Sequence, residues 1–84
     1  MPKFIDYHEK LPPMPPAAVE QMKANLKAHK TDQFGVTAMS LYMGAKGEAF
    51  CMTESPDAEA VIKSHKANGV DLKASDIHQV QSLV

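Results

Sequence analysis

Two histidines, one cysteine and two carboxylates are the residues of this chain best suited to chemistry. The stretch FCMTESPDAEAVIKSH, residues 50–65, contains Cys51, Glu54 and His65, and the segment KFIDYH near the N-terminus contains Asp6 and His8. Thiolate and imidazole groups suit nickel, zinc or copper better than magnesium or calcium. These residue types predict a metal site if the fold brings them together.

Spacing alone does not identify such a site, because the chain has no CxxC, HxH or HExxH motif. A lone cysteine is often a small buried apolar residue, and a histidine on an apolar helix face is often a hydrogen-bonded core residue. Cys51 with His65 also resembles a catalytic thiolate–imidazole pair, but no third orienting residue or oxyanion-hole loop is identifiable. We therefore expect no enzymatic activity.

Length and composition limit the remaining classes of function. Eighty-four residues predict one domain, residues 1–84, whose small core favours self-association. Nine basic and ten acidic residues give a net charge of −1 without a basic run, which argues against a nucleic-acid partner. No segment has the apolar length of a signal peptide or a membrane span, and a single cysteine suits a reducing compartment, so we expect a cytoplasmic protein without a membrane partner.

The first half of the chain predicts a strand followed by a helix. Residues 3–11 are rich in aromatic and β-branched side chains and stop at the proline cluster LPPMPP. A helix is expected from Pro16, because Val19, Met22, Leu26 and His29 then recur at helical spacing. This helix should end near the TDQFG turn.

The second half predicts a hairpin, a second helix and a last strand. Residues 36–54 form two apolar runs around a GAKG turn, and Ser55 with Pro56 is expected to start a helix that ends at Gly69. The apolar stripe of this helix is Ala58, Val61, Ile62 and His65. Residues 76–84 complete a βαββαβ order, which predicts an α+β ferredoxin-like fold: a four-stranded antiparallel sheet with two helices on one face.

The strand expected over residues 36–43 indicates that neither face of the sheet is polar. Strict alternation places Val36, Ala38 and Tyr42 on one side and Met39, Leu41 and Met43 on the other. Helices cover one face, so the other predicts contact with a second copy of the chain. We therefore expect a homodimer or a higher homo-oligomer that forms through the sheet.

The fold also places the candidate ligands along its strands and helix. His65 should lie ~14 Å from the start of its helix, and Cys51 about 10–13 Å along its strand from the same end. His8 lies at a similar level on the neighbouring strand, with Asp6 on the same side as His8. Glu54 belongs at the opposite end of the Cys51 strand, where only a dimer contact would bring it to the others.

The chain also resembles a known family. Phe4, Asp6 and His8, the Phe34-Gly35-Val36 segment, and above all FCMTESPDAEAVIKSH followed by Gly69 resemble the small bacterial ferredoxin-like proteins described as nickel-binding or nickel-responsive. The similarity covers nearly the whole chain. It implies a ferredoxin-like fold, self-association and a nickel ion held by His8, Cys51 and His65, with Asp6 and Glu54 as further candidates. The chain departs from many members at Asn68, where they have another histidine.

The leading functional hypothesis is therefore a small non-enzymatic metal-binding protein that holds nickel through thiolate and imidazole ligands. Zinc and copper accept the same ligands. The alternative is a dimeric α+β-barrel protein that binds a small molecule between sheet and helices, as monooxygenases of that architecture do, without a metal. That alternative requires a cavity beside the sheet.

Overall fold

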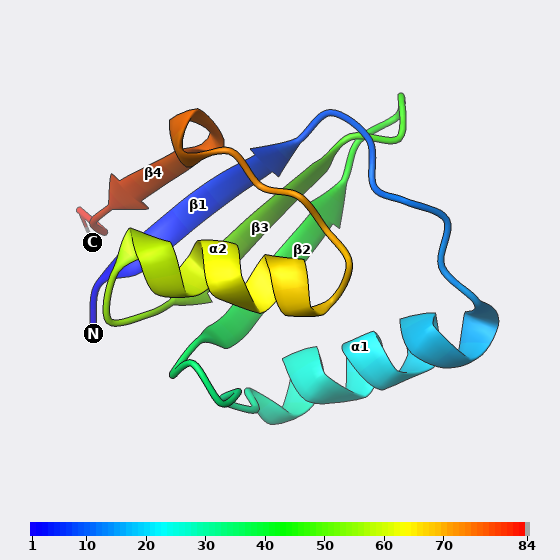
Figure 1. Ribbon diagram of the computed structural model, residues 1–84, viewed down its shortest axis with the longest axis horizontal. Coiled ribbons are helices and arrows are strands. Elements are labelled where there is room, and N and C mark those ends of the chain that lie inside the picture. Colours follow the sequence, from blue (N-terminus) through cyan, green and yellow to red (C-terminus); the bar gives the residue numbers. More distant parts are fainter. Residues whose placement is uncertain (84) are drawn as a thin grey trace.

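The computed structural model describes residues 1–83, and its architecture is the α+β arrangement that the sequence predicts (Figure 1). Within this range the chain forms, in order, β1 (Lys3–His8), α1 (Pro16–Ala28), β2 (Thr37–Met43), β3 (Ala49–Glu54), α2 (Ala58–Ala67), a 3-10 turn (Ala74–Asp76) and β4 (Ile77–Val80). The sheet order is β2-β3-β1-β4, and each neighbouring pair is antiparallel. This order is consistent with a ferredoxin-like fold. Val84, the last residue of the predicted final strand, lies outside the described residues.

Strand β1 is one of the two inner strands of the sheet, and its side chains point alternately to the two faces. Phe4, Asp6 and His8 alternate with more exposed residues and are buried on the side that faces the helices. Phe4 packs with Val61 of α2 and with Leu72 in the hydrophobic core. The same alternation that buries Phe4 thus places two polar side chains, Asp6 and His8, beneath the helices.

The β2–β3 hairpin forms as predicted but contains an irregularity that changes the side-chain pattern of β2. Gly47 has a φ of 87°, which a turn between these strands requires. The pairing shifts between Ala38 and Ser40, so that Leu41 lies opposite Cys51 and Tyr42 lies opposite Phe50. The expectation that Ala38 and Tyr42 share a face was wrong, because a bulge at this point reverses the alternation.

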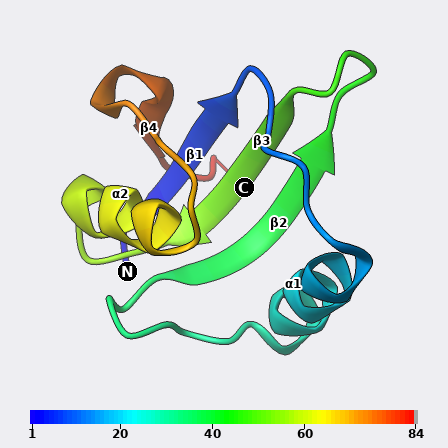
Figure 2. The ribbon, with the colours of Figure 1, turned by 45° about the vertical axis from the view of Figure 1, so that its right-hand side comes forward.

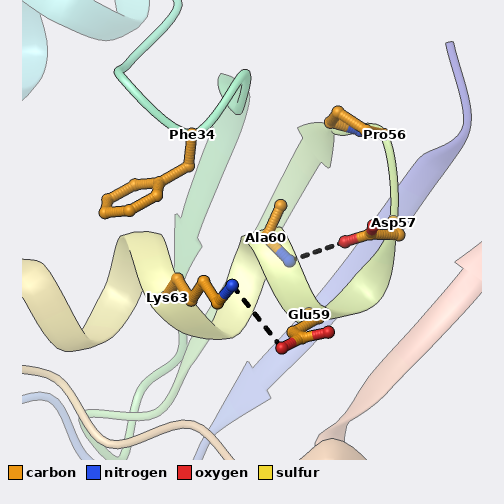
Figure 3. A pocket seen from close by; sticks show the side chains of 6 residues that line it. All are labelled: Phe34, Pro56, Asp57, Glu59, Ala60 and Lys63. Carbon is orange, nitrogen blue, oxygen red and sulfur yellow. Dashed lines mark hydrogen bonds and ion pairs between the residues drawn. The ribbon is translucent and has the colours of Figure 1, made fainter.

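Helix α2 begins two residues later than the sequence predicts. Its N-cap is Asp57, whose side chain accepts a hydrogen bond from the Ala60 amide at 2.8 Å (Figure 3). Ser55 is fully buried instead and donates from its hydroxyl to the Asp57 carbonyl at 2.8 Å. Aspartate is as good an N-cap as serine, and its negative charge also favours the helix N-terminus, so the better-placed carboxylate takes the role. At the other end Gly69 has a φ of 77°, as expected after a helix.

Helix α1 begins at Pro16 as predicted but lies apart from α2. Both views show α2 across the strands at the centre of the sheet and α1 beside β2, with a separation between the two helices (Figures 1 and 2). Among its thirteen described residues none is buried, and the N-cap, Pro15, makes no side-chain hydrogen bond. His29, expected on the apolar stripe, is exposed because it ends the helix in a left-handed conformation with a φ of 51°. The predicted stripe is therefore only half-buried at Val19, Met22 and Leu26.

The face of the sheet opposite the helices exposes aromatic side chains. Tyr7 and Phe50 pack there with ring centroids 5.3 Å apart, and Tyr42 lies opposite Phe50 on the neighbouring strand. Phe50 is 42% exposed and Tyr42 66% exposed. We call the surface formed by these three aromatic residues the open sheet face. None of the helices in residues 1–83 has the length and hydropathy that a membrane crossing requires.

Candidate metal centre

The register between β1 and β3 brings three of the predicted ligands together. Asp6 pairs directly with Cys51, and His8 is two residues further along the same side of β1. Directly opposed residues on antiparallel strands point to the same face, so Cys51 faces the helices as the metal hypothesis requires. Asp6 is fully buried, His8 is 6% exposed, and Cys51 is half-buried.

Helix α2 brings the fourth ligand, His65, over these strands. Val61 anchors the helix in the core one turn earlier. Ser64 fixes it from the side by donating a hydrogen bond from its hydroxyl to Asp32, whose other carboxylate oxygen accepts from the Phe34 amide at 2.8 Å. His65 Nδ1 lies 2.8 Å from the Val61 carbonyl and is the donor of that contact, because a carbonyl only accepts. A proton thus stays on Nδ1, and Nε2 is the nitrogen that points toward the strands; it can donate to Asp6 when protonated and ligate a metal when deprotonated.

Asp6 is the centre of the cluster. His8 Nε2 lies 2.6 Å from Asp6 Oδ1, and His65 Nε2 lies 3.3 Å from the same oxygen. The two imidazole rings stack with centroids 5.0 Å apart. The second oxygen, Asp6 Oδ2, is buried and has no hydrogen-bond partner among the described residues. A buried carboxylate oxygen without a partner is costly, and its strongest natural partner is a cation.

The protonation of the cluster follows from this burial and charge. Burial first, and then the negative charge of Asp6, raises the pKa of the Cys51 thiol from 9.0 to about 12. For His65, burial lowers the pKa, but the hydrogen bond to Asp6, the charge of Asp6 and the Val61 contact together outweigh it and leave the pKa raised above 6.5. Without a metal, Cys51 is therefore a neutral thiol and a poor nucleophile at neutral pH.

The four side chains fit a single metal ion in chemistry and in distance. One ligand atom from each of Asp6, His8, Cys51 and His65 lies within 4.8 Å of every other. Two ligands on opposite sides of one ion are roughly 4.0–4.6 Å apart, given metal–ligand distances of about 2.0–2.3 Å. The set of one oxygen, two nitrogens and one sulfur suits a borderline divalent ion rather than calcium or magnesium.

Glu54, the fifth predicted ligand, lies away from this cluster. It pairs with Lys3 and Thr37 at the far end of β3, and its parity with Phe50 places it on the open sheet face. Asp6, in contrast, was only a further candidate in the sequence and is the residue that contacts both histidines. Asn68, where the resembling family often has histidine, is the C-cap of α2, and its side chain donates to the Ser64 carbonyl at 2.9 Å.

A groove between the two helices opens above the cluster. Its volume is about 610 Å³, within the range of pockets for small organic molecules. His8, Cys51 and His65 belong to its lining, together with Thr53 of the sheet. The apolar part of the lining comes from the loop after β1, from α1, from β2 and the residue before it, and from the segment after α2: Leu11, Pro12, Pro13, Met14, Pro15, Ala18, Met22, Leu26, Val36, Ala38, Leu41 and Val70. We call this feature the interhelical groove; the small-molecule alternative requires such a cavity.

A second, smaller hollow of about 170 Å³ lies at the start of α2 (Figure 3). It is lined by Phe34 and by the first turns of the helix, where Asp57 is already used as the cap. Its lysine, Lys63, pairs with Glu59 at 3.5 Å. The carboxylates of Asp57 and Glu59 repel an anion at this helix N-terminus, so the hollow is a poorer candidate ligand site than the interhelical groove.

The fold and the cluster together define a small α+β protein with a possible Asp/His/Cys/His metal centre beneath its second helix. No protein-family description and no curated protein matches the chain. Among solved structures, the chain is similar to SCO4226 from Streptomyces coelicolor A3(2), with a TM-score of 0.69 and 26% sequence identity. The match covers 98% of this chain and 99% of that protein, so the two share one fold over their whole lengths.

Proposed function

We propose that this protein binds a divalent transition-metal ion, with nickel as the first choice, through Asp6, His8, Cys51 and His65. One observation supports this most: two imidazole nitrogens meet at Asp6 Oδ1 while the buried Oδ2 has no partner in residues 1–83. Hydrogen bonds from the two histidines explain the contacts at Asp6 Oδ1. The Cys51 thiol, whose pKa is raised in part by a side-chain hydrogen bond with Asp6, is only a weak donor to this carboxylate, whereas a cation would satisfy the carboxylate and the thiolate together.

Nickel is preferred over zinc because of the family resemblance, which the ligand set permits. Imidazole, carboxylate and thiolate are all ligands that nickel, zinc and copper accept, and nickel binds more tightly than the lighter divalent metals at such sites. A cytoplasmic location agrees with the free thiol of Cys51, which a reducing compartment preserves.

The test is a nickel titration of the purified protein without a histidine tag. We expect sulfur-to-nickel charge-transfer absorption that saturates at one ion per chain and is absent in Cys51→Ser. Glu54→Gln is the matched control, because Glu54 was also a predicted ligand and lies outside the cluster; its titration should equal that of the wild type. An absorption change that survives in Cys51→Ser, or none at all, would contradict the proposal.

We also propose that two copies associate through the open sheet face. Tyr42, Phe50 and Tyr7 form an aromatic surface of the kind that dimer interfaces bury, and a small domain gains most from such burial. Sedimentation velocity should show a dimer for the wild type and a monomer for Phe50→Glu. A wild-type monomer over the micromolar range would rule this interface out.

A further inference from the structure

We propose that the interhelical groove binds a small organic molecule with an alkyl body and a neutral nitrogen-donor head, and that the head coordinates the ion held by the cluster. This inference rests on the proposed metal binding and adds a ligand class to it. It joins two features that are described separately above, the cluster on the floor of the groove and the apolar walls.

The cluster is accessible from the side of the interhelical groove. His8, Cys51 and His65 line the groove, whereas Asp6 is fully buried and does not. Asp6 therefore lies beneath the other three, and the sheet closes that side. Nickel in tetragonal or octahedral sites takes ligands beyond four. Any further ligand must then approach from the interhelical groove.

The walls of the groove carry apolar side chains from both helices' sides. Met22 and Leu26 of α1 line it and are only half-buried, and Val70 lines it on the side of α2. Helix α1, residues 16–28, contains no buried residue. Apolar side chains that face each other across a groove, with little cover of their own, gain stability when an apolar group fills the space.

The net charge of the metal-loaded cluster indicates the polarity of the ligand head. A divalent ion with the Asp6 carboxylate and the Cys51 thiolate forms a neutral centre, so an added ligand needs no charge of its own. A neutral nitrogen heterocycle also matches the borderline character of nickel.

The experiment uses 1-methyl-, 1-butyl- and 1-hexylimidazole as probes of the nickel-loaded protein. Calorimetry measures affinity, and the nickel absorption spectrum reports coordination by the imidazole. We expect all three probes to change the spectrum and the affinity to rise by up to about fourfold per methylene, because each added methylene is buried between the helices. Metal-free protein should bind each probe at least tenfold more weakly.

Two variants of α1 separate the groove from general effects of charge. Met22→Glu places a carboxylate on the groove wall and should remove the dependence on chain length. Ala24→Glu places the same charge at an exposed position of the same helix, outside the groove lining, and should leave the series unchanged. The nickel isotherm of each variant, recorded first, shows whether the fold and the cluster are intact.

The outcomes distinguish this inference from the proposed function. If nickel does not bind before any probe is added, the proposed function fails and the inference fails with it. If nickel binds but the three probes have equal affinity, the metal centre stands and the groove is not a ligand site; closure of α1 over it would give this result. Equal binding to metal-free and nickel-loaded protein would show that the head does not reach the ion.

Discussion

Helices α1 and α2 both follow a strand and begin beside prolines, yet they are held in different ways. Helix α2 has an N-cap in Asp57, a core residue in Val61 and a partly buried hydrogen bond from Ser64 to Asp32. Helix α1, over its described residues, has neither a side-chain cap nor a buried residue. The candidate metal ligand His65 is on the well-anchored helix, and the apolar wall of the groove is on the other. The cluster residue that a helix must position, His65, thus lies on the better-packed helix.

The sharpest test of this contrast compares a histidine from each helix. His65→Ala removes a cluster ligand and should lower nickel affinity by at least the roughly 10–100-fold that is typical of losing a supporting partner. His29→Asn is the counterpart on α1 and keeps a residue that tolerates the left-handed conformation at that position. Its nickel isotherm should match that of the wild type. Equal losses in the two variants would mean that the cluster is not the binding site.

The packing difference predicts unequal effects of one substitution in the two helices. Val61→Ala should reduce the free energy of unfolding by about 2 kcal/mol, because Val61 is fully buried and its loss leaves a cavity. Val19→Ala, at a half-buried position of α1, should cost less than about 1 kcal/mol. Urea unfolding of the metal-free proteins measures both. A larger loss from Val19 would show that α1 packs more tightly in solution than the structure indicates.

The cap of α2 is a smaller test of the same anchoring. Asp57→Ala removes the acceptor of the Ala60 amide and should lower stability by about 1 kcal/mol. Asp57→Ser should recover most of the loss, since serine is also a good cap. Thermal unfolding of the three proteins side by side checks this. No difference between alanine and serine would assign the effect to charge rather than to the hydrogen bond.

The smallest effect at neutral pH is the dependence of the free energy of unfolding on pH, which is largest in alkaline solution. The pKa of Cys51 is raised to about 12 in the folded chain from 9.0, so the folded state keeps a proton that the unfolded state loses. This contribution to stability is present below pH 9 and disappears as the pH rises toward 12. The raised pKa of His65 acts in the same direction, with a loss that begins above 6.5. Cys51→Ser should abolish the alkaline part of the decline in urea unfolding of the metal-free protein, and leave the part near neutral pH.

The element order and the meeting of Cys51 with His65 could be predicted because both depend on periodicity. Strand alternation, helix spacing and the glycine turn are local signals, and level arithmetic along a known topology then brings His8, Cys51 and His65 together. The central role of Asp6 was not visible, because it depends on the register that sets Asp6 opposite Cys51. Register follows from all strands at once rather than from any single run of residues.

Three other features depend on tertiary detail that a single sequence does not carry. The irregularity between Ala38 and Ser40 reversed the predicted sides of β2. The cap of α2 moved from Ser55 to Asp57 because burial of Ser55 removed it from the role. The interhelical groove arises from the distance between α1 and α2, which helix periodicity does not determine.

The ligands of the cluster come from β1 and from the consecutive elements β3 and α2, so the cluster joins the first strand to a segment much later in the chain. An ion bound there would act as a crosslink between the first strand and the end of the second helix, much as a disulfide joins distant segments. Such a link restricts the unfolded chain most when the loop it closes is long. In a domain this small, with one cysteine and therefore no disulfide of its own, metal supply would set how long the folded chain survives proteolysis.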